Sequence, residues 1–194
     1  GVNVKIGLRK NSKTNKLVKQ DNLEYDNIIN VVKWADIISL LIPDQIMEKI
    51  YSDFIHPYLS VGKMILFSHG YNIHYKNIIP SENVDVVMVA PSGAGELVRN
   101  FFLLGDGIPN LLAIYNNYTG SAFEIILSYS CAIGGTKKGA FLSTFKEETE
   151  TDLFGEQVVL CGGIPKLIRM AFDTLVESGY QPTVAWFVCY YEVK

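Results

Sequence analysis

The chain has 194 residues, of which 48% are hydrophobic and 19% are charged, and its formal net charge is −3. This hydrophobic share is enough to build a full core, so the composition excludes an intrinsically disordered chain. A mildly acidic balance lacks the basic stripe of a nucleic-acid-binding surface, and no apolar run approaches the ~20 residues of a membrane span. We therefore expect neither nucleic acid nor a membrane as a partner.

The first part of the chain alternates between predicted strands and predicted helices. Residues 1–8 (GVNVKIGL) predict a strand, and because this strand starts at once without a leading methionine, we expect the chain to be part of a longer protein. Apolar residues at helical spacing follow over 25–32. The compact apolar run 35–43 predicts a buried strand, and residues 44–59 predict a helix that Pro57 ends.

Three further apolar runs predict buried strands, at 63–70, 84–91 and 109–117. Strands of continuous apolar character that alternate with helices are typical of a parallel sheet covered on both faces. The sequence therefore predicts an α/β fold of the Rossmann-like class, with helices on both sides of a parallel sheet.

The character of the sequence changes near residue 143, where one predicted helix begins to follow another. The pair Gly162–Gly163 predicts a break between two of these helices, and Gly179 and Pro182 predict the next break. We therefore divide the chain into an α/β domain of residues 1–143 and the beginning of an all-α domain, residues 144–194.

The three cysteines, Cys131, Cys161 and Cys189, are far apart in the sequence and form no CxxC pair. Neither a zinc site nor a disulfide framework is therefore indicated. Cysteines that are few, far apart and outside such motifs are typical of reduced thiols that pack as small apolar groups. Because thiols stay reduced in the cytoplasm, we expect a cytoplasmic protein.

The segment after the first predicted strand bears on nucleotide binding. A doubly wound sheet binds a nucleotide at the carboxyl ends of its strands, where an acidic residue bonds a ribose 2′-hydroxyl and a cation with hydroxyls accepts a 2′-phosphate. Arg9, Ser12 and Thr14 follow residues 1–8 without a carboxylate among them, which favours NADP over NAD. An ordinary basic surface loop explains the same residues. Spacing alone favours that alternative, because no Gly-rich GxGxxG turn precedes them.

Five carboxylates lie between Glu147 and Glu156. Three of them, Glu148, Asp152 and Glu156, are four residues apart and would project from one side of a helix. Carboxylate oxygens suit Mg²⁺, which keeps several of its waters. The alternative is a solvated, charge-rich helix start with nothing bound. The apolar residues after Asp152 favour the metal site, because they should draw Glu156 toward the core, where a carboxylate needs a partner.

His69 is the histidine best placed for chemistry, because it ends the predicted strand 63–70, at the edge where doubly wound folds carry their active sites. It would serve as an acid, a base or an orienting group. His56 and His74 are interpreted as surface or packing residues. No GxSxG motif and no Cys–His pairing indicates a covalent nucleophile.

Four motifs occur along the chain in the order FSHGYNIHY, DVVMVAPSGAG, GGTKKG and KEETETDLFGEQVVLCGG. In this order they resemble ketol-acid reductoisomerase of the short bacterial class, and the match runs essentially end to end. The resemblance implies an N-terminal Rossmann domain and a C-terminal knotted helical domain. It also implies an Mg²⁺-dependent alkyl migration in 2-acetolactate or 2-aceto-2-hydroxybutyrate. Reduction with NADPH to a 2,3-dihydroxy acid would follow, in valine, isoleucine and leucine biosynthesis.

The resemblance also implies roles by position. The cofactor residues that it implies are Arg9, Ser12 and Thr14 at the NADPH 2′-phosphate, Asp44, Gln45, Ile46 and Met47 along the cofactor, and Gly95 near the nicotinamide. His69 matches the catalytic histidine and Glu148 a supporting acid. Asp152 and Glu156 match Mg²⁺ ligands. Glu192 matches a ligand that comes from a partner subunit, so we expect a homo-oligomer.

Three positions depart from the family pattern, and one of them is Tyr191, where the family usually has a histidine before Glu192. Val188 stands where the family has the first carboxylate of a Glu-x-x-x-Glu pair that ends at Glu192, so affinity for a second Mg²⁺ should fall. Ser92 stands where the family has a lysine near the metal site. Two alternatives therefore stay open. One is a degenerate homologue that keeps nucleotide binding without catalysis, and the other is a different NADP-dependent dehydrogenase whose acid cluster is only structural.

Overall fold

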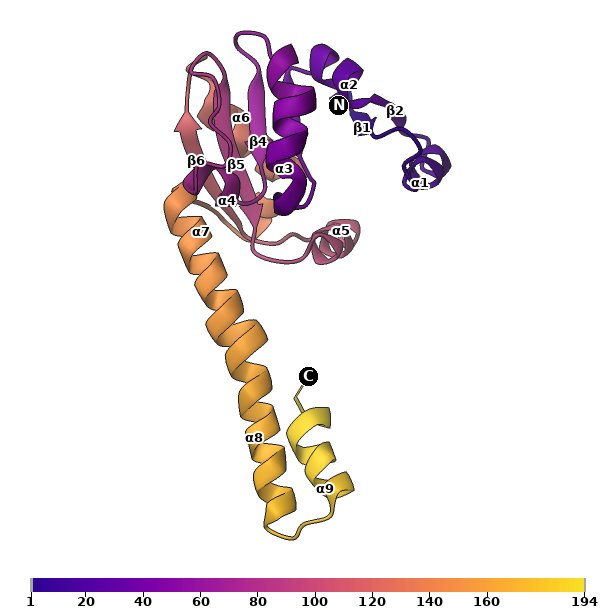
Figure 1. The fold of residues 1–194 in the computed structure, drawn as a ribbon, viewed down its shortest axis with the longest axis vertical. Coiled ribbons are helices and arrows are strands. Elements are labelled where there is room, and N and C mark those ends of the chain that lie inside the picture. The colour runs from indigo at the N-terminus through magenta and orange to yellow at the C-terminus, as the bar shows by residue number, and fades with distance from the viewer. Residues whose placement is uncertain (1, 194) are drawn as a thin grey trace. The chain divides into compact units, whose positions relative to one another are not determined.

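The computed structural model describes residues 2–193, so the two terminal residues, one of them in the first predicted strand, lie outside the described part. The chain divides into two compact units, and the division falls inside helix α7 (Phe145–Phe154), between Thr149 and Glu150 (Figure 1). Among the described residues, no helix combines the length and the apolar character needed to cross a membrane.

Unit 1 is built around a five-stranded sheet with the strand order β3–β4–β5–β6–β7. Its strands are β3 (Ile37–Leu40), β4 (Met64–Phe67), β5 (Asp85–Pro91), β6 (Asn110–Asn116) and β7 (Ala140–Leu142). A separate two-stranded parallel sheet pairs β1 (Lys5–Leu8) with β2 (Glu24–Asn27). The predicted α/β fold with a Rossmann-like parallel sheet is confirmed, since β3, β4 and β5 run parallel, as do β6 and β7.

The strands differ from the prediction in two ways: one strand runs in the opposite direction, and two short strands form that the sequence pattern does not predict. β6 runs antiparallel to β5, because an apolar run predicts a buried strand but does not encode its direction. The sequence pattern predicts neither β2, which is polar, nor β7, which has three residues. β2 continues directly into helix α2 (Ile28–Trp34), so the helical spacing over 25–32 belongs to a strand end followed by a helix.

Helices cover both faces of the sheet, and β4 lies between them with all its residues buried. Ile65 and Phe67 pack in a cluster with residues of α2 and of α3 (Asp44–Ile50). Met64 and Leu66 point to the opposite face and pack in a cluster with residues of α6 (Ala122–Ala132). Each large apolar side chain buried in this way stabilises the fold by about 1.5–3 kcal/mol. The strand that leads to His69 is therefore held firmly from both sides.

The predicted helix over 44–59 forms in three parts. α3 continues as the π-helical turn η1 (Tyr51–Ile55) and ends in the 3₁₀ turn η2 (His56–Tyr58), which contains Pro57. Burial raises the pKa of Tyr51 to about 12, and its hydroxyl lies 3.3 Å from Nδ1 of the exposed His56. The remaining helices of unit 1 are short: α1 (Asn15–Gln20), α4 (Tyr71–His74), α5 (Gly95–Leu103) and the 3₁₀ turn η3 (Gly135–Lys137).

Unit 2 is helical. After the end of α7 it contains η4 (Gly155–Gly163), α8 (Ile164–Glu177), α9 (Pro182–Trp186) and η5 (Phe187–Tyr191), of which η4 and η5 are π-helical. The break predicted at Gly162–Gly163 is wrong, because the helical path continues from α7 through η4 into α8. The wide π turns bring the carbonyl oxygens of Gln157 and Val158 so close to the two glycines that a Cβ would clash. The predicted break at Gly179 (φ +91°) and Pro182 is confirmed.

Candidate active site

The carboxyl end of β4 carries the histidine that the sequence singles out. The strand ends at Phe67, and Ser68 and His69 follow it on the way to helix α4. Helix α7 packs its first turn against the same edge, with the Phe145 ring edge-on to Phe67 at 6.1 Å between ring centroids. This packing brings His69 next to Glu148, which is 79 residues away in the chain.

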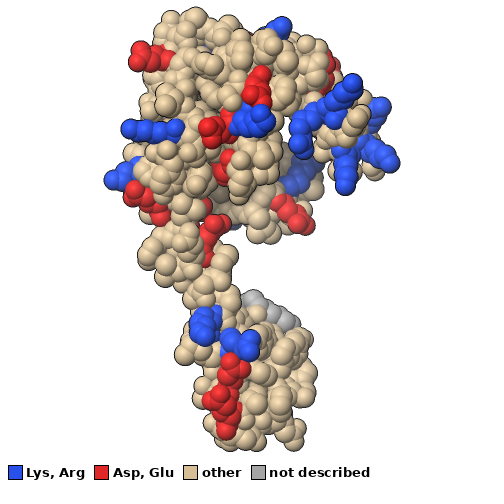
Figure 2. All heavy atoms as spheres, in the orientation of Figure 1, with Lys and Arg blue, Asp and Glu red and all other residues tan. Residues whose placement is uncertain are grey.

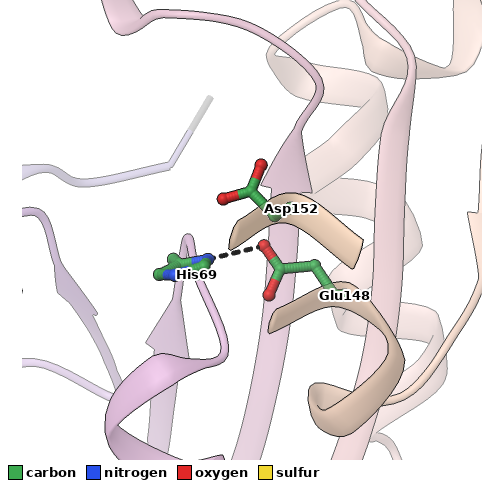
Figure 3. A group of neighbouring side chains, drawn as sticks. All are labelled: His69, Glu148 and Asp152. Carbon is green, nitrogen blue, oxygen red and sulfur yellow. Dashed lines mark hydrogen bonds and ion pairs between the residues drawn. The ribbon is translucent and has the colours of Figure 1, made fainter. Parts of the chain in front are cut away.

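His69 and Glu148 form the centre of the candidate site (Figure 3). His69 Nδ1 lies 2.8 Å from Glu148 Oε1, and the Glu148 side chain is buried whereas His69 is half-buried. An ionised carboxylate only accepts hydrogen bonds, so this contact places a proton on Nδ1 and leaves Nε2 as the basic atom of a neutral ring. The pair can therefore take up and release a proton at Nε2, with Glu148 stabilising the charged form of the ring.

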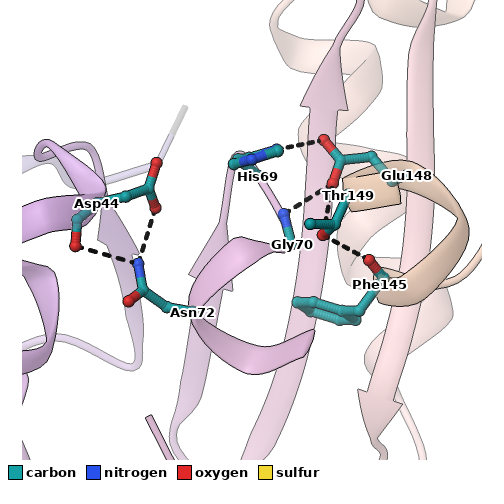
Figure 4. Close-up of polar contacts among 7 residues, drawn as sticks. All are labelled: Asp44, His69, Gly70, Asn72, Phe145, Glu148 and Thr149. Carbon is teal, nitrogen blue, oxygen red and sulfur yellow. Dashed lines mark hydrogen bonds and ion pairs between the residues drawn. The ribbon is translucent and has the colours of Figure 1, made fainter. Parts of the chain in front are cut away.

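The second oxygen of Glu148 is held mainly by the backbone. Gly70 donates its N–H to Glu148 Oε2 at 2.8 Å, and Thr149 Oγ1 lies 3.4 Å from the same oxygen (Figure 4). A buried carboxylate is tolerated when it is paired and hydrogen-bonded in this way. Because both oxygens are engaged, the orientation of Glu148 is fixed, and through it the orientation of the His69 ring.

Gly70 allows the loop after β4 to approach helix α7 closely. A Cβ at this position would lie 2.5 Å from Thr149 Oγ1, 2.6 Å from the Phe145 carbonyl oxygen and 3.0 Å from Glu148 Oε2. Thr149 in turn donates its hydroxyl to that carbonyl oxygen at 2.7 Å. Sequence reasoning missed Gly70 and Thr149. The available signal was a glycine directly after a candidate catalytic residue, which is typical of close backbone approach.

Asp152 lies four residues after Glu148 on the same helix, as the spacing predicts. His69, Glu148 and Asp152 each offer a ligand atom, and these three atoms all lie within 4.8 Å of one another (Figure 3). Asp152 is exposed, and a carboxylate that faces water suits Mg²⁺, which keeps several of its waters. The residues present therefore fit a hard cation at Asp152, with Glu148 orienting the histidine.

Two further predicted metal ligands lie in unit 2. Glu156 is exposed in η4, so the expectation that the apolar flank draws it into the core is wrong. The physical reason is that Val158, Val159 and Leu160 of that flank are themselves exposed, so η4 has no core for the carboxylate to enter. Glu192 follows η5 and is also exposed.

The residues predicted to hold a 2′-phosphate follow β1. Arg9, Ser12 and Thr14 lie in the connection between β1 and α1, and Ser12 Oγ accepts the Thr14 N–H at 3.3 Å. The surface around them is basic, and Figure 2 shows Lys and Arg side chains gathered over α1. The exposed cations of this segment are Arg9, Lys10, Lys13, Lys16 and Lys19. An anion would meet a positive field here.

The residues predicted to line the cofactor lie at the starts of two helices. Asp44, Gln45, Ile46 and Met47 form the first turn of α3, and Met47 is buried. Asp44 Oδ1 accepts Nδ2–H of Asn72 at 2.8 Å, which ties this turn to helix α4 (Figure 4). Gly95 is the exposed first residue of α5 and lines an open pocket of about 240 Å³.

Known protein families match both parts of the chain. Residues 1–139 match the family model described as acetohydroxy acid isomeroreductase, NADPH-binding domain, and residues 145–194 match the one described as ketol-acid reductoisomerase, C-terminal domain. A ketol-acid reductoisomerase (NADP(+)) of Petrotoga mobilis is 50% identical over 194 residues, which are 100% of this chain and 59% of that protein. The chain therefore spans less than two thirds of this relative's length.

Solved structures are similar to the chain in fold. A structure described as an NADH-preferring ketol-acid reductoisomerase from an uncultured archean has a TM-score of 0.88 and 42% identity, covering 98% of this chain and 57% of that one. A putative oxidoreductase from Jannaschia sp. CCS1 has a TM-score of 0.74, covering 95% of this chain and 70% of that one. Its identity is only 13%, so this second likeness shows the fold alone.

Proposed function

The chain belongs to the ketol-acid reductoisomerase family, and we propose that the protein converts 2-acetolactate or 2-aceto-2-hydroxybutyrate into a 2,3-dihydroxy acid. The proposed reaction is an Mg²⁺-dependent alkyl migration followed by reduction with NADPH, in valine, isoleucine and leucine biosynthesis. The observation that carries the proposal is the contact of 2.8 Å between His69 and Glu148. Asp152 follows Glu148 by four residues on the same helix, α7.

His69 is proposed to move the protons of the migration. The substrate loses a proton from the hydroxyl on its second carbon as the alkyl group moves, and the neighbouring keto oxygen gains one. Nε2 of His69 takes the first proton and returns it to the new hydroxyl, while Glu148 keeps its contact with Nδ1. Proton transfer by a positioned side chain of this kind accelerates a reaction by typically ~10²–10⁴-fold.

Asp152 and Glu156 are proposed to hold Mg²⁺, with Glu192 of the partner subunit adding another carboxylate in a cytoplasmic homo-oligomer. Bound Mg²⁺ would polarise the substrate oxygens and stabilise the charge that develops during the migration. The support is that Asp152 and Glu156 are exposed carboxylates four residues apart on one continuous helical path.

Arg9, Ser12 and Thr14 are proposed to bind the 2′-phosphate of NADPH, with Asp44 to Met47 and Gly95 along the rest of the cofactor. The match of residues 1–139 to an NADPH-binding domain and the name of the Petrotoga relative support this cofactor. The archaeal relative is described as NADH-preferring, so the preference has to be measured on this protein.

Arg9→Ala is expected to narrow the preference for NADPH over NADH by ~1–2 kcal/mol, the contribution of a charge-assisted contact with a phosphate. The preference is measured as the ratio of kcat/KM for the two cofactors. Lys16→Ala removes the same charge from α1 outside the proposed trio, so this control should change the ratio by less than about twofold. An unchanged ratio in Arg9→Ala would remove Arg9 from the phosphate site.

Val188→Glu is expected to lower the half-saturating Mg²⁺ concentration by ~10-fold, because it adds a hard carboxylate ligand four residues before Glu192. Val188 is exposed in η5, so the new charge stays hydrated. Val193→Glu adds the same charge on the other side of Glu192 and is the matched control, which should change Mg²⁺ dependence by less than about twofold. Equal Mg²⁺ dependence in Val188→Glu and wild type would contradict the proposed ligand role of this pair.

Product analysis tests the proposed reaction. With 2-acetolactate, Mg²⁺ and NADPH, the longest natural form of the protein should yield 2,3-dihydroxy-3-methylbutanoate, whose two methyl groups on one carbon record the migration in an NMR spectrum. Methyl groups on different carbons would indicate plain reduction by another NADP-dependent dehydrogenase. No product from a protein that still binds NADPH would indicate a degenerate homologue, the alternative that Val188 and Ser92 favour.

A further inference from the structure

Asn72 is a buried polar residue that the proposed mechanism does not use. It lies in α4, three residues after His69, and is 1% exposed. Its Nδ2 lies 2.8 Å from Asp44 Oδ1, 3.4 Å from the Asp44 carbonyl oxygen and 3.5 Å from Met47 Sδ (Figure 4). Asn72 is thus in contact with two of the four residues proposed to line the cofactor along α3.

The orientation of the Asn72 amide is set by the Asp44 carboxylate, and the contact on the other side of the amide is longer. Its Oδ1 lies 3.4 Å from Nδ2 of Asn77, and its Nδ2 faces the Asp44 carboxylate. An ionised carboxylate can only accept, so the group that faces it has to be a donor. A side chain without a donor at position 72 would therefore leave this oxygen of Asp44 without its partner in the fold.

The segment His69–Asn72 has two anchors within unit 1 (Figure 4). At one end, His69 and Gly70 contact Glu148 at 2.8 Å each. At the other end, Asn72 contacts Asp44 at 2.8 Å. Four consecutive residues thus connect the acid of α7 with the turn that starts α3, and they set the distance between the proposed proton-transfer pair and the proposed cofactor turn.

We propose that Asn72 is a positioning residue that aligns the turn Asp44–Met47 with His69, so that the cofactor along this turn faces the substrate near His69. The inference rests on the proposed function. Hydride transfer is sensitive to displacements of about 1 Å, so NADPH binding and the reduction step depend on Asn72. The migration depends on His69, Glu148 and Asp152, and the His69–Glu148 and Gly70–Glu148 contacts do not involve Asn72.

The direct test is Asn72→Asp in the longest natural form of the protein. The new carboxylate would face Asp44, and two like charges at this distance repel. The Kd of NADPH, from a fluorescence titration, is expected to rise by ~10-fold. The kcat for reduction of the rearranged 3-hydroxy-2-keto acid is expected to fall by ~10–100-fold. The half-saturating Mg²⁺ concentration should stay within about twofold of wild type.

A matched control and a rescue variant separate positioning from support of the fold. Asn77→Ala leaves the Asn72 donor in place and should stay within about twofold of wild type in all three measurements. Asp44→Asn/Asn72→Asp restores the contact with donor and acceptor exchanged. In a double-mutant cycle with both single variants, it should recover at least ~5-fold of the NADPH affinity that Asn72→Asp loses.

Three results would overturn the inference. The first is a lower melting temperature in Asn72→Asp with an unchanged Kd and an unchanged reduction rate, which would show that Asn72 only supports the fold. The second is failure of the exchanged pair to recover affinity, and the third is a wild-type protein that does not bind NADPH. The titration needs no turnover. A wild-type protein that binds NADPH but converts no 2-acetolactate would therefore contradict the proposed function. The double-mutant cycle, which is measured by NADPH affinity, would still test the role of Asn72.

Discussion

Asp152→Asn is expected to reduce turnover of 2-acetolactate by at least ~100-fold, because changes to the surroundings of a metal ligand already cost ~10–100-fold. The substitution keeps the size of an exposed side chain on α7 and removes its charge, and a neutral amide is a poor substitute for a carboxylate at Mg²⁺. NADPH binding should stay within about twofold, because the substitution leaves the fold of unit 1 in place. Initial rates and an NADPH titration on the same preparation measure both effects.

Glu150→Gln is the matched control for Asp152→Asn. It neutralises another exposed carboxylate of α7, two residues from Asp152, and is expected to keep activity within about twofold of wild type. Equal losses of activity in Asp152→Asn and Glu150→Gln would show that the total charge of the helix matters and that Asp152 is not a specific Mg²⁺ ligand. Loss of both turnover and NADPH binding in Asp152→Asn would show that the residue supports the fold.

Gly70→Ala is expected to reduce turnover by ~100-fold, because a displacement of about 1 Å at the reacting groups has an effect of this size. The added methyl would lie 2.5 Å from Thr149 Oγ1 and 2.6 Å from the Phe145 carbonyl oxygen. The hydroxyl can rotate away, but the carbonyl oxygen can move only with the helix. Either the loop or α7 therefore shifts, and Glu148 loses the alignment that the Gly70 N–H and His69 give it. Overpacking should also lower the free energy of unfolding by about 1–3 kcal/mol.

Gly155→Ala is the matched control for Gly70→Ala. A Cβ at Gly155 has no neighbour within 4 Å, so this variant should keep activity and stability close to wild type. Steady-state kinetics and denaturant unfolding measure both quantities. Wild-type activity and stability in Gly70→Ala would show that the loop and α7 adjust without cost, and Gly70 would then have no part in positioning Glu148.

Much of the fold follows from local pattern. The apolar runs that became β4 and β5 are buried because both faces of the sheet are covered there, and a run without alternation predicts that environment. The runs that became β3 and β6 are buried only in part, since β3 alternates between exposed and buried residues and the end of β6 is exposed. Strand direction is a property of long-range connection, so the antiparallel β6 could not be predicted. At Gly162–Gly163 the local pattern predicts a helix break that does not form. Glycines that usually break a helix here permit wide π-helical turns, because a Cβ would clash with carbonyl oxygens five residues earlier.

The site was predictable where it depends on spacing within one segment. Glu148 and Asp152 lie on one helix four residues apart, as the sequence predicts, and His69 follows a buried strand. The partners of these residues were not predictable from spacing, because the His69–Glu148 contact joins segments 79 residues apart. The same holds for Asn72 and Asp44, which are 28 residues apart. The cofactor assignments for Arg9, Ser12, Thr14 and Gly95 stay predictions.

The measurement that tests the central claim most directly is NADPH consumption with 2-acetolactate, with and without Mg²⁺, on the longest natural form of the protein. Mg²⁺-dependent consumption that stops when the metal is chelated is the predicted result, and it would show that Val188 and Ser92 are tolerated. Consumption that does not need Mg²⁺, or no consumption while NADPH still binds in a parallel titration, would contradict the assignment of Asp152 and His69 to a metal-assisted migration.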